Sequence, residues 1–327
     1  MIRTTSVRAV SEGGDRRLRR LGEELVEAGL PAFADQLLLE LLLDEVDHAL
    51  RPAVHERRVP STGTIIQPTS PPDTWPRSTQ LEIVHTPVGP QPLAAFRQFA
   101  DGLSSWLLRR TEGDDEWVMF DRPAGSERDL VVLAGAFAAI IVQRHPSGSV
   151  RMVGDFGVLR AEGREWHHEP PVATWIDALT TCGSAGDAGV LGAILEFAVH
   201  DLGAQGIGAL LIYRPDDQPG PPVEERLPPP PLLSVRTPLH LAPLRHALAQ
   251  VDGAAVFDRH GVLRQLGVRV VPSMAAEDTV EALGGTRHTS GRRYSHDDPA
   301  ATVIAVSEDG PVTVLRNGAV LGRSARG

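Results

Sequence analysis

The sequence predicts an α/β protein. A C-terminal domain with a central mixed, twisted sheet flanked by helices should follow a smaller α+β domain and N-terminal helices. Two observations carry this prediction. Helical hydrophobic periodicity alternates with short apolar runs through the C-terminal half, which is typical of a sheet covered by helices. The length of 327 residues also exceeds the roughly 100–200 residues of a single domain.

Residues 1–50 are predicted to contain two helices. Leucine and valine recur at helical spacing after Asp15, and Gly29 and Pro31 interrupt the pattern. The second helix contains the stretch LLLELLLDEVDHAL, whose leucines cover more than one face. This arrangement fits core packing on two sides, and it also fits use in an oligomer contact.

Residues 51–181 are predicted to form a small α+β unit. Strand-like stretches lie at 63–67, 80–85, 117–120, 139–144, 150–156 and 157–160, with an amphipathic helix over 93–110 and a short helix over 175–181. The glycine-rich segment CGSAGDAG that follows is predicted to be a hinge between domains.

Residues 188–327 are predicted to alternate helices with strands. The predicted helices cover 190–202, 238–250 and 278–283, and the predicted strands cover 207–213, 254–258, 262–265, 301–307, 312–316 and 319–321. Gly206 should end the first helix, and Asn317-Gly318 is a strong hairpin turn. The proline-rich stretch 215–231 is more typical of a stiff surface loop than of an SH3-type ligand.

Charge limits the kind of partner. Acidic residues outnumber basic ones 42 to 32, which gives a formal charge of −10. The chain lacks the excess positive charge that releases counterions from a polyanion, so we expect neither extended nucleic acid nor anionic membrane as a partner. All 32 basic residues are Arg, which excludes Lys as a nucleophile or a phosphate ligand.

The remaining composition predicts a cytoplasmic protein. Cys182 is the only cysteine, which excludes an internal disulfide and a thiolate zinc cluster and fits a reducing compartment. The longest apolar run, 130–142, has 13 residues and is too short to span a bilayer. No hydrophobic signal core follows the N-terminus.

Three short segments concentrate polar groups suited to a nucleotide. VDGAAVFD (251–258) places a carboxylate before Gly-Ala at the mouth of a strand. GGTRHTSGRRYSH (284–296) has three glycines, three arginines, two histidines, several hydroxyls and no acid, which suits a polyphosphate. AVSEDG (305–310) ends a strand with two acids. Each segment alone also fits a turn or a solvated loop. Together, Asp252 and Glu308 or Asp309 could hold a divalent ion beside the basic loop.

In their order and spacing these segments resemble the diadenylate cyclase (DAC) domain, the catalytic module of bacterial cyclic di-AMP synthases. The matching stretches are Asp252-Gly253-Ala254, Gly285-Thr286-Arg287-His288 and Val306-Ser307-Glu308-Asp309, and IGALLIY (207–213) looks like the family's first core strand. The resemblance covers roughly residues 188–322. Residues 110–172 more weakly resemble sensor domains that precede some DAC domains, through FDRP, SERDLVVLAGAF, the strands around 150–156 and GREW.

Three positions depart from the family pattern. Thr289 replaces the last Arg of an Arg-His-Arg motif, Val251 stands where a His often precedes Asp-Gly-Ala, and His296 replaces the Glu of a Ser-Glu step. The first two lie close to the implied chemistry. Spacing allows Arg292 or Arg293 to supply the missing charge.

The resemblance implies a metal-dependent nucleotidyltransferase, a diadenylate cyclase that condenses two ATP into the second messenger cyclic di-AMP with loss of two pyrophosphates. The implied catalytic residues are Asp252, Gly253, Ala254, Arg287 and His288; the implied nucleotide-binding residues are Gly285, Thr286, Thr289, Ser307, Gly208 and Ala209; the implied ligands of Mg²⁺ or Mn²⁺ are Asp252, Glu308 and Asp309.

The resemblance also implies an oligomer. Each DAC domain holds one ATP, so the expected active state is a homodimer or higher oligomer with DAC domains face to face, controlled by the N-terminal domain. The departures at Thr289 and Val251 keep a second hypothesis open. In that hypothesis the chain is a catalytically impaired nucleotide-binding sensor, or a scaffold, with a degenerate DAC fold.

Overall fold

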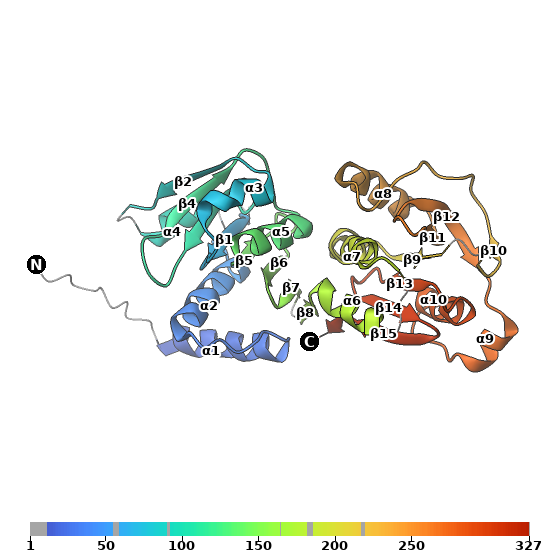
Figure 1. Cartoon of the computed structure of the whole chain (residues 1–327). Coiled ribbons are helices and arrows are strands. Elements are labelled where there is room, and N and C mark those ends of the chain that lie inside the picture. Colours follow the sequence, from blue (N-terminus) through green and yellow to red (C-terminus); the bar gives the residue numbers. More distant parts are fainter. Residues whose placement is uncertain are drawn as a thin grey trace, which may run out of the picture. The chain divides into compact units, whose positions relative to one another are not determined.

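The computed structural model describes residues 12–54, 59–89, 92–163, 165–181, 186–216 and 220–326 (Figure 1). The chain divides into two compact units, Met1–His168 with Arg326–Gly327 and Glu169–Ala325. Cys182 and part of the predicted hinge lie outside the described residues, as do residues 217–219 of the proline-rich stretch. None of the described helices combines the length and the apolar character that crossing a membrane requires.

The N-terminal unit is built on a sheet with the strand order β16-β8-β7-β6-β5-β1-β3-β4-β2. The strands are β1 (Thr62–Ile66), β2 (Ile83–Pro87), β3 (Ser105–Arg109), β4 (Glu116–Phe120), β5 (Ile140–Arg144), β6 (Val150–Gly154), β7 (Gly157–Glu162), β8 (Glu165–Glu169) and β16 (Ala325–Arg326). The helices are α1 (Glu12–Glu27), α2 (Gln36–Leu50), η1 (Pro72–Thr74), α3 (Trp75–Thr79), α4 (Leu93–Arg97) and α5 (Glu127–Phe137). β1 runs parallel to β3 and antiparallel to β5.

Helices cover both faces of this sheet, and the alternation of side chains along each strand divides the core in two. In β1, Ile65 packs with Trp75 of α3 and Phe137 of α5, whose rings lie 4.3 Å apart between centroids. The next residue, Ile66, packs in a separate cluster with the leucines of α1 and α2. The unit therefore has two apolar layers around one sheet.

The helix predicted over residues 93–110 is wrong. The segment contains the short helix α4 and then the strand β3. Between them the carboxylate of Asp101 accepts hydrogen bonds from the backbone N–H groups of residues 103–105, at 2.7–2.9 Å, and turns the chain. Gly102 takes a left-handed φ of +70° in this turn. A polar turn in the middle of an apolar pattern thus overrides the helical periodicity.

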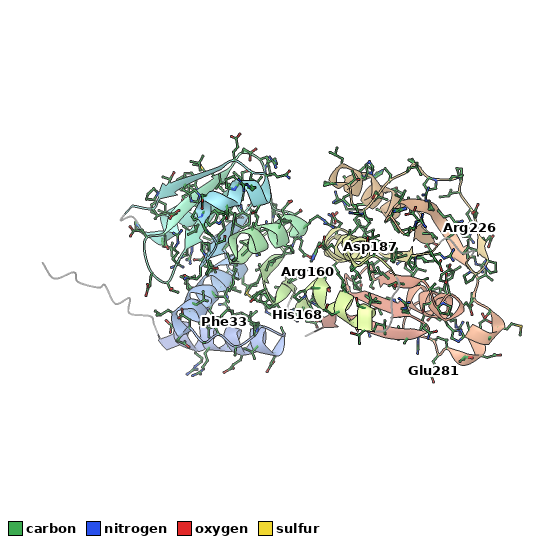
Figure 2. All side chains as sticks on the ribbon, viewed as in Figure 1. Phe33, Arg160, His168, Asp187, Arg226 and Glu281 are labelled. Atoms are coloured by element: carbon green, nitrogen blue, oxygen red, sulfur yellow. The ribbon has the colours of Figure 1, made fainter. Side chains whose placement is uncertain are left out.

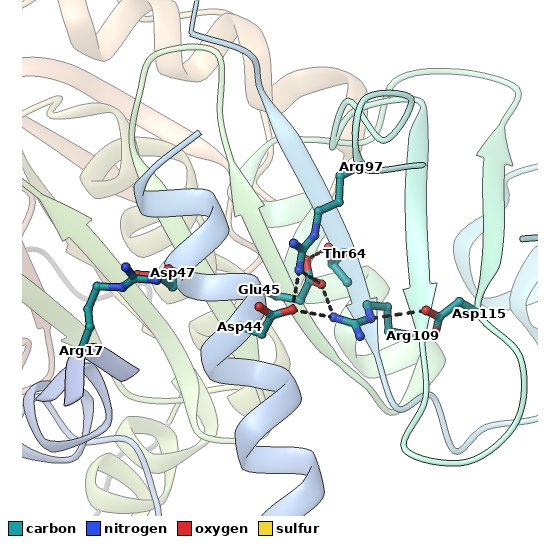
Figure 3. A network of polar contacts seen from close by, with 8 residues as sticks. All are labelled: Arg17, Asp44, Glu45, Asp47, Thr64, Arg97, Arg109 and Asp115. Atoms are coloured by element: carbon teal, nitrogen blue, oxygen red, sulfur yellow. Dashed lines mark hydrogen bonds and ion pairs between the residues drawn. The ribbon is translucent and has the colours of Figure 1, made fainter. Parts of the chain in front are cut away.

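A charged network fixes α2 to the sheet (Figure 3). Arg97 donates to Asp44 and to Glu45, at 2.6 Å in each case, and Arg109 donates to the same two carboxylates. The hydroxyl of Thr64 donates to Glu45 at 2.8 Å. Burial raises the pKa of Asp44, but Arg97 and Arg109 outweigh burial and hold this pKa below its ordinary value. Glu45 is only 1% exposed, so these partners replace the water that its carboxylate would otherwise bind.

A second buried ion pair joins α5 to β7. Arg160, labelled in Figure 2, donates through Nε and Nη2 to both carboxylate oxygens of Glu127, at 2.5 and 2.7 Å. Glu127 follows Ser126, which starts α5 in a capping box with Asp129. The bidentate pair therefore holds the capped end of the helix against the sheet.

The C-terminal unit has a sheet with the order β10-β12-β11-β9-β13-β14-β15. Its strands are β9 (Ala209–Tyr213), β10 (Val223–Glu224), β11 (Ala254–Phe257), β12 (Leu263–Val270), β13 (Thr302–Val306), β14 (Val312–Arg316) and β15 (Ala319–Arg323). β9 and β11 are parallel, and the other neighbouring strands are antiparallel. The sheet is mixed, as the sequence predicts.

Helices flank this sheet on both faces. They are α6 (Val172–Thr181), α7 (Ala188–Glu196), the π-helical turn η2 (Phe197–Leu202), η3 (Gly203–Gln205), α8 (Pro238–Gln250), α9 (Met274–Thr279) and α10 (Thr286–Asp297). Leu211 of β9 packs in the cluster that contains α6, α7, η2 and α8. Its neighbours Leu210 and Ile212 pack on the opposite face with Tyr294 of α10. The α/β class predicted from the sequence is therefore confirmed.

Two local predictions in this unit are wrong. The helix expected over 278–283 is α9, which begins earlier because the hydroxyl of Ser273 accepts from the N–H of Ala276 at 3.1 Å and caps it. The segment 284–296, taken as a basic loop, is mostly the helix α10. Its buried residues are Gly291, Tyr294 and Ser295, with no aliphatic side chain among them, so hydrophobic periodicity does not reveal the helix.

Glu45→Ala should lower the free energy of unfolding of the N-terminal unit by about 3–5 kcal/mol, because Arg97 and Arg109 would lose a buried counter-charge. Four of the five tryptophans lie in this unit, so urea unfolding followed by tryptophan fluorescence reports it. The exposed Glu82→Ala is the control and should stay within about 0.5 kcal/mol. An equal decrease in the free energy of unfolding in the two variants would show that the buried network does not stabilise the unit.

Candidate functional site

Strand direction brings three distant segments to one edge of the C-terminal sheet. β9 and β11 are parallel, so both begin at this edge, and the antiparallel β13 ends there. The registers of β11 and β13 against β9, extended past the strand ends, place Asp252 and Ser307 on either side of Gly208. The topology thus brings together residues about 100 positions apart in the sequence.

A cleft of about 370 Å³ opens at this edge. It is lined by Gly206, Ile207, Gly208, Leu248, Ala249, Gln250, Val251, Asp252, Arg287 and Glu308. Small-molecule sites commonly occupy about 300–1,000 Å³, so the cleft has room for part of a nucleotide. The lining thus combines the end of α8 with the charged residues Asp252, Arg287 and Glu308.

An ion pair lies across the cleft. Arg287 Nη1 donates to Glu308 Oε1 at 3.0 Å, and the two side chains are 36% and 71% exposed. An exposed pair of this kind contributes at most about 1 kcal/mol because water and salt screen it. A ligand of higher charge, such as a triphosphate, can therefore take Arg287 from Glu308 at little cost.

Glycine makes room for these side chains. A Cβ at Gly208 would overlap Nη1 of Arg287 and would lie 2.7 Å from Cγ of Glu308. Two further glycines support the turn that carries Glu308: a Cβ at Gly203 would lie 2.7 Å from the carbonyl oxygen of Gly310, and one at Gly206 would lie 3.0 Å from that of Glu308. The segment 203–208 therefore forms a close-packed base under Arg287 and Glu308.

Asp252 is positioned by a left-handed glycine. Gly253 has φ +114°, and a Cβ there would lie 2.7 Å from the carbonyl carbon of Gly267 and 2.9 Å from the carbonyl oxygen of Val268. The backbone of β12 thus passes directly against Gly253. Only glycine fits this approach without strain, and the contact holds the exposed Asp252 at the mouth of the cleft.

The first turn of α10 provides backbone donors beside the cleft. Gly285 is the N-cap with φ +89° and supplies no capping side chain. The first N–H groups of a helix have no partner within the helix and favour an anion. Arg287 belongs to this turn, so its guanidinium and the helix N-terminus lie in the same element.

His288 belongs to the same turn and is half-buried. Burial, together with the positive charges of Arg323 and Arg287, lowers the pKa of its imidazole below the ordinary value of 6.5. His288 is therefore neutral at pH 7. It offers a hydrogen-bonding group there rather than a second cation.

The structure brings together four of the residues singled out in the sequence, Gly208, Asp252, Arg287 and Glu308. The others lie next to them in the chain: Ala209 in β9, Gly253 and Ala254 at the start of β11, Gly285, Thr286 and His288 at the start of α10, and Ser307 and Asp309 in the turn after β13. Asp309 is exposed and does not line the cleft. The hydroxyl of Thr289 donates to the carbonyl oxygens of Leu283 and Gly285, so its hydrogen bonds are made at the start of α10.

The arginines that could replace the charge lost at Thr289 are engaged elsewhere. Arg292 donates to the carbonyl oxygens of Gly318, at 2.8 Å, and Glu281, at 3.1 Å. Arg293 lies 3.9 Å from the carboxylate of Glu277. Among the residues that line the cleft in the described part of the chain, Arg287 is the one cation.

Sequence reasoning missed two parts of the site. One is the segment 248–250 at the end of α8, which lines the cleft through residues with no chemical signature. The other is Arg323 of β15, whose charge acts on His288. Arg323 is one residue beyond the region that resembles the family, and no local pattern marks it.

The donor set fits a magnesium or manganese ion held together with phosphate. Asp252 and Glu308 supply carboxylate oxygens to one cleft. Mg²⁺ is usually bound through one or two carboxylates plus substrate phosphates rather than by a complete protein cage. Across the described ranges, no group of three or more His, Cys, Asp or Glu side chains is arranged to hold a metal without such help.

Two family models match the chain. Residues 196–320 match the family described as DisA bacterial checkpoint controller nucleotide-binding (DAC), and residues 19–170 match the family described as probable sensor domain DACNK. The first match includes every residue that lines the cleft. The second lies within the N-terminal unit except for its last two residues.

Several solved structures are similar to part of the chain. One of them is the crystal structure of a hypothetical membrane spanning protein from Bacillus cereus, 17% identical, with a match that covers 43% of this chain and 72% of that one at a TM-score of 0.29. No curated protein matches the chain.

Gly253→Ala should lower the free energy of unfolding of the C-terminal unit by about 1–3 kcal/mol, because a side chain at φ +114° is strained and meets the backbone of β12. Hydrogen–deuterium exchange of β9 and β11 measures the change. Gly284→Ala is the matched control, since a Cβ there has open space, and it should stay within about 0.5 kcal/mol. Equal protection in the two variants would contradict the close approach.

His288 should make the C-terminal unit less stable in acid. Its pKa is lowered in the folded state, so the unfolded chain takes up the proton first as the pH falls below about 6.5. The free energy of unfolding should therefore decline from pH 7 to pH 5, and less steeply in His288→Gln. Chemical denaturation at a series of pH values measures this slope. An identical slope in the variant would mean that the folded state does not disfavour the protonated imidazole.

Proposed function

We propose that this protein, a member of the DAC domain family with an N-terminal sensor domain, condenses two ATP molecules into cyclic di-AMP and releases two pyrophosphates. The family matches confirm the resemblance seen in the sequence, and they identify 196–320 as a nucleotide-binding domain. The observation that carries the proposal is the cleft in which Gly208, Asp252, Arg287 and Glu308 meet.

Arg287 and the start of α10 bind the triphosphate in this proposal. The guanidinium exchanges its weak pair with Glu308 for charge-assisted hydrogen bonds to phosphate oxygens. The N–H groups of the first helical turn add donors, and neutral His288 adds a hydrogen-bonding group. Glycines at 208 and 285 let the phosphates approach the backbone closely.

The chemistry is two in-line transfers. The 3′-hydroxyl oxygen of one ATP forms a bond to the α-phosphorus of the other while the bond from that phosphorus to pyrophosphate breaks, and the hydroxyl proton is released. Asp252 orients the attacking hydroxyl by accepting its hydrogen bond. Such reactions depend on positioning and on stabilisation of the phosphoryl charge, which is what Asp252 and Arg287 offer.

Asp252 and the released Glu308 would hold Mg²⁺ or Mn²⁺ together with the phosphates. The ion supplies charge neutralisation on the transferring phosphoryl group. Opening the pair between Glu308 and Arg287 thus frees one group for phosphate and the other for the metal. This coupling explains why the two side chains neighbour each other over Gly208.

Two DAC domains have to meet face to face, because each cleft holds one ATP and the product joins two. A two-fold homodimer is the simplest such arrangement. The N-terminal sensor domain would regulate this encounter. The compartment expected from the cysteine content, the cytoplasm, stays a prediction.

One observation favours a second candidate, a nucleotide-binding regulator without turnover. Thr289, Arg292 and Arg293 all bond within the chain, so Arg287 is the one cation that lines the cleft in the described residues. A site with fewer cations stabilises the transferring phosphoryl group less. It can still bind ATP through Arg287 and the helix N-terminus.

The full chain incubated with ATP and Mn²⁺ should produce cyclic di-AMP, measured by chromatography with mass detection. Asp252→Asn should reduce the rate by about 100-fold or more, because the variant loses the carboxylate that orients the hydroxyl. Asp278→Asn makes the same chemical change at an exposed position of α9 and should retain the rate.

Calorimetric titration with ATP separates the two candidates. ATP binding that Arg287→Ala abolishes, without product, supports the regulator and contradicts the cyclase. Neither binding nor product would contradict both. Product that survives Asp252→Asn would contradict the assigned role of Asp252.

A further inference from the structure

A groove runs along the N-terminal helical hairpin and encloses about 840 Å³. Its floor is apolar, with Leu18, Gly22 and Val26 from α1 and Leu39 and Leu43 from α2. Val26 is 57% exposed, so this floor is open to water in one copy of the chain. An exposed apolar surface with a polar rim is typical of an interaction site.

In the described part of the chain, the rim of the groove has one basic and four acidic residues. α1 and α2 run antiparallel, since Arg17 pairs with Asp47 at 2.7 Å near one end of the hairpin and Gly22 lies over Leu43. Glu27 and Glu40 therefore line the end of the groove near the hairpin turn, and Arg19 lines the other end. Asp44 lies at the end with Arg19 but is already paired with Arg97 and Arg109, and Glu23 lies between the two ends. Arg19 is thus the one cation that lines the groove in the described residues, and it lies far from Glu27 and Glu40 of its own copy.

Electrostatics within α1 do not account for this pattern. The last turn of the helix contains acidic residues and no basic one, although the helix dipole favours cations there. Arginines precede glutamates by four residues, as in Arg20 and Glu24, which is the less favourable order for such pairs. The charge pattern of α1 is therefore less favourable within one copy than the reverse order would be.

A second α1, packed antiparallel, would bring residues of opposite charge from the two copies together. If a two-fold axis passes Gly22, Leu18 of the second copy lies over Val26 of the first, because 18 and 26 are equally far from 22. Arg19 of the second copy then lies beside Glu27 and Glu40. Gly22 has no side chain, so the two helices can approach closely at the axis. Symmetry makes each of these contacts occur twice.

We propose that this groove is an interface between two copies of the chain, in which each α1 lies antiparallel in the α1–α2 groove of the other. The four helices form a bundle around Leu18, Val26, Leu39 and Leu43. The interface goes beyond the cyclase reaction and does not depend on it. It gives the sensor domain its own means of pairing two chains.

A cysteine at the axis tests the interface separately from any contact between DAC domains. Gly22→Cys in a Cys182→Ser background should oxidise to a covalent dimer, because the two thiols face each other across the axis. A Cβ at Gly22 meets only Leu43 at 3.5 Å, an ordinary contact, so the variant should fold. Glu24→Cys in the same background is the control, since Glu24 lines a different surface of α1 and should cross-link at least about tenfold more slowly.

Charge exchange supplies the second criterion. In the Gly22→Cys background, Arg19→Glu or Glu27→Arg alone should slow cross-linking about tenfold, because like charges then face each other twice. Both changes in one chain, or an equimolar mixture of the two single variants, should restore the rate. Both positions are exposed, so loss of folding does not explain a slow rate that the mixture restores.

Two results would overturn the interface. One is cross-linking at equal rates from positions 22 and 24, which would show that α1 has no preferred facing partner. The other is cross-linking at position 22 that is unaffected by Arg19→Glu or not restored in the mixture. If the groove binds an apolar small molecule rather than a second copy, positions 22 and 24 should cross-link at equal rates. Cyclase activity enters neither readout, so these outcomes are independent of the proposed reaction.

Discussion

The parallel pairing of β9 with β11 is the constraint on which the candidate site depends. In an antiparallel sheet, neighbouring strands start at opposite edges, but here both strands start at one edge and the antiparallel β13 ends beside them. The crossover through α8 makes the parallel pair possible. Because Gly253 has no side chain, the start of β11 packs closely against the backbone of β12, and this contact positions Asp252.

In the proposed reaction, the charges at this edge change partners. Arg287 and Glu308 neutralise each other in an exposed pair that is weak in water. A triphosphate with a divalent ion offers each of them a partner of higher charge. The wider chain is acidic and has no lysine, so a single arginine, a helix N-terminus and a metal would carry the binding of phosphate. These few local groups are enough for a chain of net charge −10 to bind a polyanion at one place.

Motif order in the sequence was sufficient to predict the family and four residues that line the cleft, because each motif lies at the end of a strand or the start of a helix. Local patterns failed where tertiary contacts decide the structure. The helix α10 was taken for a loop because its buried residues are Gly291, Tyr294 and Ser295 rather than leucines at helical spacing. The helix predicted over 93–110 is interrupted by a turn that the carboxylate of Asp101 stabilises, and the chain continues as the strand β3. Arg323 acts on His288 only because β15 packs beside α10, and residues 248–250 line the cleft without any chemical signature in the sequence.

The most direct test of the account is a crystal structure of the full chain with a non-hydrolysable ATP analogue and Mn²⁺. The account predicts phosphate oxygens within hydrogen-bonding distance of Arg287 and of the first N–H groups of α10. It also predicts that Glu308 has left Arg287 and, with Asp252, faces the metal. A triphosphate bound away from this edge of the sheet, or bound while Arg287 and Glu308 stay paired, would contradict it.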